Sequence, residues 1–138
     1  MPVLYDTQDC RFTYPGKRAT TEWIRRTAAL EGRETGDISV VFCSDDALLA
    51  INRQYLQHDY LTDIITFDYS EGTVISGDLM ISVDTVRSNA AAYGVGFREE
   101  LMRVIIHGIL HLCGYGDKTP AEEKQMRALE NKYLAIRE

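Results

Sequence analysis

Two histidines four positions apart are the residues whose types and spacing most directly suggest chemistry. His107 and His111 belong to residues 107–117, which read HGILHLCGYGD. At about 100° per residue, positions four apart lie on one side of a helix, so both imidazoles can reach one ion. Gly114 is expected to end this helix as a left-handed cap and to let Asp117 return towards the same point. These three ligands would leave a fourth tetrahedral position open, as in a catalytic zinc site.

Either histidine alone could instead be a hydrogen-bonded core residue, the commoner role for a single His in an apolar helix. On a helical wheel, however, Glu100 and Arg103 join the two histidines in one narrow polar stripe, and apolar residues cover nearly all the rest. Polar groups on a buried helix are costly unless they are paired or bound to metal. The stripe therefore favours a metal site.

Gly108 distinguishes this pattern from the zinc protease signature, in which the residue after the first His is a Glu that acts as general base. The missing side chain argues against ordinary peptide hydrolysis. Because Gly in a helix costs about 1 kcal/mol relative to Ala, it also predicts close packing of another backbone or a substrate there.

The overall composition predicts one globular domain over residues 1–138, with 45% hydrophobic and 26% charged residues. Three Cys without a C-x-x-C pair suit reduced thiols in a cytoplasmic protein. The N-terminus has no basic start, and no apolar run approaches 18 residues, so neither secretion nor membrane spanning is expected. The net charge of -6 disfavours a non-specific nucleic-acid binder, although a local basic patch is compatible with it.

The first half of the chain predicts a helix, a strand and a second helix, after residues 11–15 that could be strand or loop. Thr20 or Thr21 can cap a helix through Leu30, with Gly32 at its end. Residues 37–43 are β-branched and aromatic, which is typical of a strand. Ser44 would cap the next helix. Its expected inner face consists of Leu48, Ile51 and Tyr55.

The second half predicts a hairpin followed by three helices. Residues 64–69 and 74–82 should pair as antiparallel strands around the turn at 71–72. Ser82 or Asp84 opens a helix that closes at Gly94, and the two-histidine helix follows. Thr119 begins a capping box that leads into a terminal helix, whose inner side would carry Met126, Leu129, Tyr133 and Leu134. The pattern predicts an α+β fold with a small mixed sheet of about four strands and about five helices.

Three stretches carry motifs: residues 62–67 (TDIITF), residues 77–82 (GDLMIS) and residues 107–115 of the two-histidine segment. Together they resemble the YbeY-type family of ribosomal RNA maturation endoribonucleases, whose corresponding motifs are T-D-V-L-S-F, G-D-I-x-I-S and H-G-x-L-H-L-x-G-Y-D-H. Asn52 and Tyr55 fall where the family carries L-N-x-x-Y. Order and spacing agree from about Val40 to the end of the chain.

The resemblance implies a zinc ion in a cleft between helix and sheet, and cleavage of single-stranded RNA. Its implied roles are maturation of the 3′ end of small-subunit ribosomal RNA and ribosome quality control, with ribosomal RNA and the small subunit as partners. His107 and His111 would be two metal ligands. Where the family has Asp-His, this chain has Gly116-Asp117, so Asp117 would be the third. A carboxylate is a competent zinc ligand, and harder ions such as Mn or Fe would be better tolerated.

A second departure concerns binding of the phosphate. Leu56 stands at the family's usual Arg, and Leu61 at its Pro before T-D. An Arg fork can donate two hydrogen bonds to one anion, which Leu56 cannot do. The sequence leaves open which cation replaces it; the candidates are Arg53, His58, Arg103 and Lys118.

The mechanism expected is metal-assisted phosphodiester hydrolysis, in which a cationic residue steadies the developing charge. Candidate general bases are Asp63, Asp78 and Glu100, although Glu100 lies two helical turns from His107, about 10 Å away and too far for a metal ligand. RNA bases could stack on Tyr60, Tyr69 or Tyr115.

Two other functions stay open. The first is a non-catalytic ribosome assembly factor whose metal is structural, which the missing Arg and the acidic balance favour. The second is a general metallohydrolase acting on peptides or small esters, which Gly108 disfavours.

Overall fold

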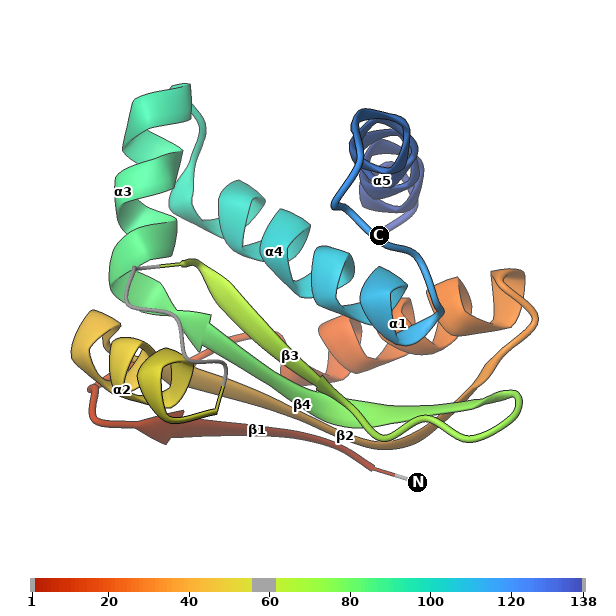
Figure 1. The fold of residues 1–138 in the computed structure, drawn as a ribbon, viewed down its shortest axis with the longest axis horizontal. Helices are drawn as coiled ribbons and strands as arrows, with labels where there is room; N and C mark the ends of the chain where they lie inside the picture. Colours follow the sequence, from red (N-terminus) through yellow and green to blue (C-terminus); the bar gives the residue numbers. More distant parts are fainter. Residues whose placement is uncertain (1, 56–61, 138) are drawn as a thin grey trace.

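The structure is a computed structural model that describes residues 2–55 and 62–137 (Figure 1). Within these residues the elements follow one another as β1 (Val3–Gln8), α1 (Lys17–Leu30), β2 (Glu34–Cys43), α2 (Asp45–Tyr55), β3 (Ile64–Asp68), β4 (Val74–Ser82), α3 (Val83–Tyr93), α4 (Phe97–Leu112) and α5 (Pro120–Leu134). None of the helices in these ranges combines the length and the apolar character that crossing a membrane requires.

The four strands form one mixed sheet in the order β1-β2-β4-β3. β1 and β2 run parallel, β2 and β4 run parallel, and β3 pairs antiparallel with β4. The β3–β4 hairpin sets Ile64 opposite Ile81 and Thr66 opposite Leu79. The expected α+β fold, with a mixed sheet of four strands and five helices among the described residues, is confirmed.

Helix α4 lies at the centre of the main core, between the sheet and α5 (Figure 1). Ile105, Ile106 and Ile109 on this helix are fully buried. The sheet contributes alternate residues to the same core, because successive strand side chains point to opposite faces; those of β2 are Ile38, Val40 and Phe42. Helix α1 packs against β2 in this layer, and α5 packs on α4.

Helix α2 covers part of the opposite face of the sheet. Leu48 packs there with Ile65 of β3 and Met80 of β4 in a second, smaller cluster. Helix α4 thus covers one face of β3 and β4, and α2 covers the other face. Strand β3 is at the edge of the sheet among the described strands.

Several predicted helix ends are confirmed. The Ser44 hydroxyl accepts a hydrogen bond from the Ala47 backbone N–H, and Ser82 caps α3, which ends at a left-handed Gly94. Thr119 forms the complete capping box with Glu122. Such caps were predictable because the hydrogen bonds that make them join residues a few positions apart.

Other predictions near the N-terminus and in α2 were wrong. Helix α1 starts at Lys17, after a left-handed Gly16 without a side-chain cap, instead of at Thr20 or Thr21. Residues 11–15 are a loop, one of the two alternatives left open, and a strand that was not predicted lies earlier, at Val3–Gln8. On α2, Tyr55 is 62% exposed and Asn52 takes the buried position.

Candidate metal centre

Three side chains from α4 and the loop after it converge on one point. The Nε2 atoms of His107 and His111 are 3.0 Å apart. The Asp117 Oδ2 atom lies 3.2 Å from the first Nε2 and 3.3 Å from the second. Among the described residues, these three are the group of His, Cys, Asp and Glu side chains whose ligand atoms all lie within 4.8 Å of one another.

The other ring nitrogen of each histidine is held by a hydrogen bond. The Nδ1 atom of His107 lies 2.7 Å from Oε2 of Glu130, and the Nδ1 atom of His111 lies 2.8 Å from the backbone carbonyl oxygen of Tyr115. Both partners are acceptors, so each Nδ1 carries the proton and donates it. Each Nε2 therefore directs a lone pair towards Asp117, which is the tautomer that a metal ligand requires.

This donor set fits a divalent cation. Two imidazole nitrogens and a carboxylate oxygen lie within 3.3 Å of one another, and in the neutral rings their lone pairs repel. A cation would remove the repulsion among them. Nitrogen and oxygen donors of this kind suit zinc and neighbouring first-row metals. The group of His107, His111 and Asp117 could hold a metal ion.

Glu130 of α5 is the buried anion that orients His107. It is 5% exposed, and its Oε1 accepts a hydrogen bond of 2.9 Å from Arg103. Burial alone would raise the pKa of Glu130, but the hydrogen bonds from His107 and Arg103 outweigh it and lower the pKa. Burial likewise opposes the charged form of His107, whereas the Glu130 bond raises the pKa of the imidazole, with a net rise. Glu130 thus supports a basic, well-oriented ligand.

The loop that carries Asp117 is fixed at both ends. Gly114 has a φ of 103°, in the left-handed region that favours glycine, and so reverses the chain after α4. The Tyr115 N–H then bonds back to the Leu110 carbonyl, and its hydroxyl donates to Glu31 at 2.6 Å. At the other end, the Thr119 capping box starts α5. The predicted turn at Gly114 that returns Asp117 to the histidines is present.

Two cavities meet at the candidate ligands. One, of about 440 Å³, lies towards α5 and is lined in part by Glu100, Arg103 and Glu130. The other, of about 540 Å³, lies along β3 and α2 and is lined in part by Asn52, Thr66 and Lys118. Asp63, His107 and Asp117 line both cavities. The centre therefore faces open space on two sides.

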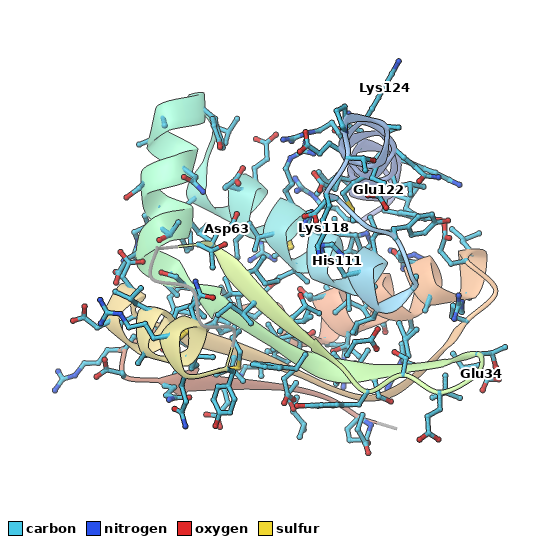
Figure 2. All side chains as sticks on the ribbon, viewed as in Figure 1. Glu34, Asp63, His111, Lys118, Glu122 and Lys124 are labelled. Atoms are coloured by element: carbon cyan, nitrogen blue, oxygen red, sulfur yellow. The ribbon has the colours of Figure 1, made fainter. Side chains whose placement is uncertain are left out.

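Asp63 and Lys118 are the predicted auxiliary residues that the structure brings to the centre. Figure 2 shows Asp63 at the β3 end that faces α4, and Lys118 beside His111. Burial raises the pKa of the Asp63 carboxyl, and the neighbouring His107 opposes the rise. Lys118 is exposed and lines the cavity along β3. Both residues line a cavity that reaches the candidate ligands.

Arg103 and Asp78 are engaged by neighbouring side chains. Arg103 is engaged by Glu130 and by Asn131, whose Oδ1 accepts a hydrogen bond of 2.9 Å. Asp78 accepts from the Tyr69 hydroxyl and lines neither cavity. Arg53 lines neither cavity.

The predictions for His58, Tyr60, Leu56 and Leu61 lie outside the described residues.

Tyr115 and Gly108 both have structural contacts. The Tyr115 hydroxyl is bonded to Glu31, so its ring is part of the scaffold. A Cβ on Gly108 would lie 2.8 Å from Leu79 Cδ2 and 2.9 Å from Ile64 Cδ1. The expected close packing is present, but its partners are side chains of the sheet, not a backbone or a substrate. Helix α4 lies so close to the sheet at this position that a side chain on residue 108 would push the helix away.

Sequence reasoning missed Glu130 and the Tyr115 carbonyl. A signal for Glu130 existed, since it is four positions after Met126 and three before Tyr133, both predicted on the inner side of the terminal helix. A carboxylate on a buried helix face needs a partner. The partner itself depends on how α5 packs on α4, which no local pattern predicts.

The fold and centre define a class: small α+β proteins with two histidines of one helix and a following loop residue as potential metal ligands. The model of the family described as Endoribonuclease YbeY matches residues 7–137. The chain belongs to this family.

Relatives of nearly the same length support the assignment. The chain is 56% identical to a protein named Endoribonuclease YbeY from Bacteroides thetaiotaomicron, over 99% of this chain and 100% of the relative. A protein of the same name from Phocaeicola vulgatus is 57% identical over 97% of each chain. The solution structure of TM1509 from Thermotoga maritima is similar with a TM-score of 0.65 and 26% identity, covering 96% of this chain and 87% of that one.

Proposed function

We propose that residues 1–138 work as one metal-dependent endoribonuclease domain that hydrolyses phosphodiester bonds in single-stranded RNA. Its expected substrate is ribosomal RNA near the 3′ end of the small-subunit species, in the cytoplasm, with the small subunit as partner and with a part in ribosome quality control. Family membership supports the RNA substrate. The specific RNA site, the compartment and the ribosomal partner are inferred for this chain from its family membership.

One observation carries the proposal: the two Nε2 atoms and the Asp117 oxygen converge where two cavities meet. An endonuclease must accommodate chain on both sides of the bond it cuts. A centre that closes on one side would fit an end of a chain, whereas this one is open towards α5 and towards β3. The arrangement supports internal cleavage.

We assign one bound zinc ion to His107, His111 and Asp117, with manganese or iron as tolerated substitutes. The chemistry supplied there by the ion is Lewis acidity, which activates water and polarises a phosphoryl oxygen. Glu130 and the Tyr115 carbonyl keep the two imidazoles in the ligating tautomer. These groups position the ligands.

Two further side chains would accept the proton of the water and neutralise the charge of the phosphate. We assign to Asp63, whose pKa is raised by burial, the role of accepting the proton of the attacking water. We assign to Lys118, which lines the cavity along β3, the neutralisation of the phosphate that an Arg at position 56 would provide. Arg103 is less suited, because Glu130 and Asn131 already engage its guanidinium.

The test combines metal content and cleavage on the same samples. Elemental mass spectrometry of the purified wild type, Asp117→Ala and His111→Ala would accompany an assay on single-stranded ribosomal RNA. The proposal expects about one zinc per wild-type chain, and loss of both zinc and cleavage in each variant. Retention of zinc by Asp117→Ala would show that the third ligand is wrong.

The assembly factor is the second candidate, and the engagement of Arg103 by Glu130 favours it. A protein of this kind would bind zinc and the small subunit but would not cut RNA. If metal-loaded wild type binds small subunits while no preparation cleaves RNA, this function replaces the nuclease. A general peptide hydrolase is disfavoured because Gly108 packs against the sheet and provides no base.

A further inference from the structure

The cavity towards α5 contains a buried carboxylate that the proposed chemistry does not use. Glu100 of α4 is 6% exposed and lines this cavity. Among the described residues, no hydrogen bond or ion pair engages its side chain, although Glu130 on the same wall has three such partners. Buried carboxylates are normally paired. The Glu100 oxygens are not among the fully enclosed unpaired polar atoms, so they are open to the cavity and available to a ligand that brings N–H donors.

The charges around Glu100 indicate what kind of ligand that is. Asp63, Asp117 and Glu123 line the same cavity. The two arginines on its wall both face Glu130, with Arg103 at 2.9 Å and Arg127 at 3.6 Å. The carboxylates of the lining outnumber these two arginines, which already face Glu130. The cavity therefore disfavours a phosphate and favours a neutral group with N–H donors.

The position of the cavity indicates that the neutral group with N–H donors is a nucleotide base. It shares Asp63, His107 and Asp117 with the cavity along β3, so it begins where the cleaved phosphate would be held. The two nucleotides that flank this phosphate must place their bases on one or the other side of the metal centre. The volume of about 440 Å³ lies within the usual range for small-molecule sites, about 300–1,000 Å³. Tyr93 and Met126 provide an aromatic and an apolar wall for a base to contact.

We propose that this cavity binds the base of one nucleotide next to the cleaved phosphate, and that Glu100 selects guanine there; the inference rests on the proposed nuclease function. A carboxylate has two oxygens that accept parallel hydrogen bonds. Guanine offers two adjacent donors, N1–H and the N2 amino group, on its Watson–Crick edge. Adenine and cytosine offer one amino donor beside a ring-nitrogen acceptor, and uracil offers N3–H between two carbonyls. Guanine alone satisfies both oxygens.

The pKa of Glu100 agrees with this assignment. Burial raises it, the Asp63 carboxylate adds to the rise, and the Arg103 guanidinium opposes it. The charged form is therefore short of compensation in the free protein. Two N–H donors from a base would supply that compensation.

The test uses zinc-loaded wild type, Glu100→Gln and the control Glu99→Gln. Glu99 is the exposed neighbour on the same helix and does not line this cavity, so its variant removes the same charge. Single-stranded RNA oligonucleotides with one cleavable site would carry each of the four bases at each flanking position, and competition would give relative kcat/KM. A melting curve would check that each variant is folded.

We expect wild type and Glu99→Gln to prefer guanine at one flanking position by about tenfold, since a good bidentate base contact is worth about 1–3 kcal/mol. Glu100→Gln should lose this preference, so that its relative kcat/KM values for the guanine and uracil substrates become nearly equal. Equal slowing on all four substrates would overturn the inference, because it would make Glu100 a general participant in the reaction. An unchanged preference in Glu100→Gln would overturn it as well.

Binding without cleavage separates this inference from the nuclease function. Calorimetry would compare guanosine and uridine 5′-monophosphate, which carry the same phosphate. Tighter binding of the guanosine compound that depends on Glu100 supports the base site even if no RNA is cut, in which case only the nuclease function fails. Equal affinities in wild type would count against the base site.

Discussion

Glu130 is the single residue on which the geometry of the centre most depends outside the ligands. It fixes His107 at 2.7 Å and is itself fixed by Arg103. Its replacement by Gln keeps the shape but removes the negative charge that the imidazole faces. Partners of metal-bound histidines typically contribute 10–100-fold to metal affinity.

We therefore expect Glu130→Gln to weaken zinc binding by about 10–100-fold. Competition with a chromophoric chelator would measure the dissociation constants. Glu99→Gln, which changes the same charge on an exposed surface, should bind zinc as wild type does. Equal affinity in all three proteins would show that Glu130 does not support the ligand.

Asp63 allows a prediction with a defined pH dependence. As a general base it must be ionised, and burial raises its pKa. Activity should therefore be lost as the pH falls through this raised pKa, at a higher pH than an ordinary Asp would give. Asp63→Asn should lower kcat by about 10²-fold or more, with a smaller change in KM.

A pH profile of kcat for wild type and Asp63→Asn checks this assignment. The exposed Asp37→Asn of β2, remote from both cavities, serves as the control and should match wild type. A variant at position 63 that keeps wild-type kcat would exclude Asp63 as the base.

At the scale of elements, the contact of α4 with the sheet is closest at Gly108. Alanine normally stabilises a helix by about 1 kcal/mol relative to glycine. Here the added Cβ would come within 2.8 Å of Leu79 and 2.9 Å of Ile64, so α4 or the strands must shift. Overpacking of this kind costs about 1–3 kcal/mol.

We expect Gly108→Ala to lower the free energy of unfolding by about 1–3 kcal/mol and to weaken metal binding, because the His107 and His111 backbones move with α4. Urea unfolding measures the first effect. Ser88→Ala, on the exposed side of α3, should stay within about 0.5 kcal/mol of wild type. A Gly108→Ala variant more stable than wild type would show that the Leu79 and Ile64 side chains can move aside without loss of free energy of unfolding.

The parts of the fold that the sequence could predict are those determined by neighbouring residues. The two-histidine helix, the β3–β4 hairpin and the caps at Ser44, Ser82 and Thr119 all depend on spacings of a few positions. β1 was not predicted, because its residues after Tyr5 are exposed and polar and its hydrogen bonds go to β2, more than thirty positions away. The start of α1 was missed because Gly16 offers no side-chain cap.

The same division holds for the candidate site. The approach of His107, His111 and Asp117 follows from one helical turn and one glycine turn, which are local. The role of Glu130 and the engagement of Arg103 depend on α5 packing across α4. The two cavities require β3, α4 and α5 together, so no pattern within one segment could have predicted them.

For the molecule as a whole, metal binding should be coupled to stability. The ligands come from α4 and the following loop, and the groups that orient them come from that loop and α5, so the site exists only in the folded chain. A ligand at 100 times its dissociation constant adds about 2.7 kcal/mol of stability.

We expect zinc to raise the Tm of wild type by several degrees and a chelator to reverse the rise. Asp117→Ala should show little response to zinc over the same concentrations. Differential scanning calorimetry with and without the metal measures both. An equal rise in the variant would point to zinc bound elsewhere on the folded protein.

One chain of hydrogen bonds extends from the centre into the core. The Tyr115 carbonyl accepts from His111, and the Tyr115 hydroxyl donates to Glu31. Glu31 also accepts from the Tyr133 hydroxyl, and the carbonyl of Tyr133 accepts from the indole N–H of Trp23 at 2.8 Å.

Because the sequence contains a single tryptophan, the molecule carries its own optical reporter. Occupancy at His111 can alter the environment of the indole through this chain, so the intrinsic fluorescence of Trp23 should follow metal loading without any added dye. The rate of metal binding at the centre could thus be measured by stopped-flow from the fluorescence of the buried Trp23.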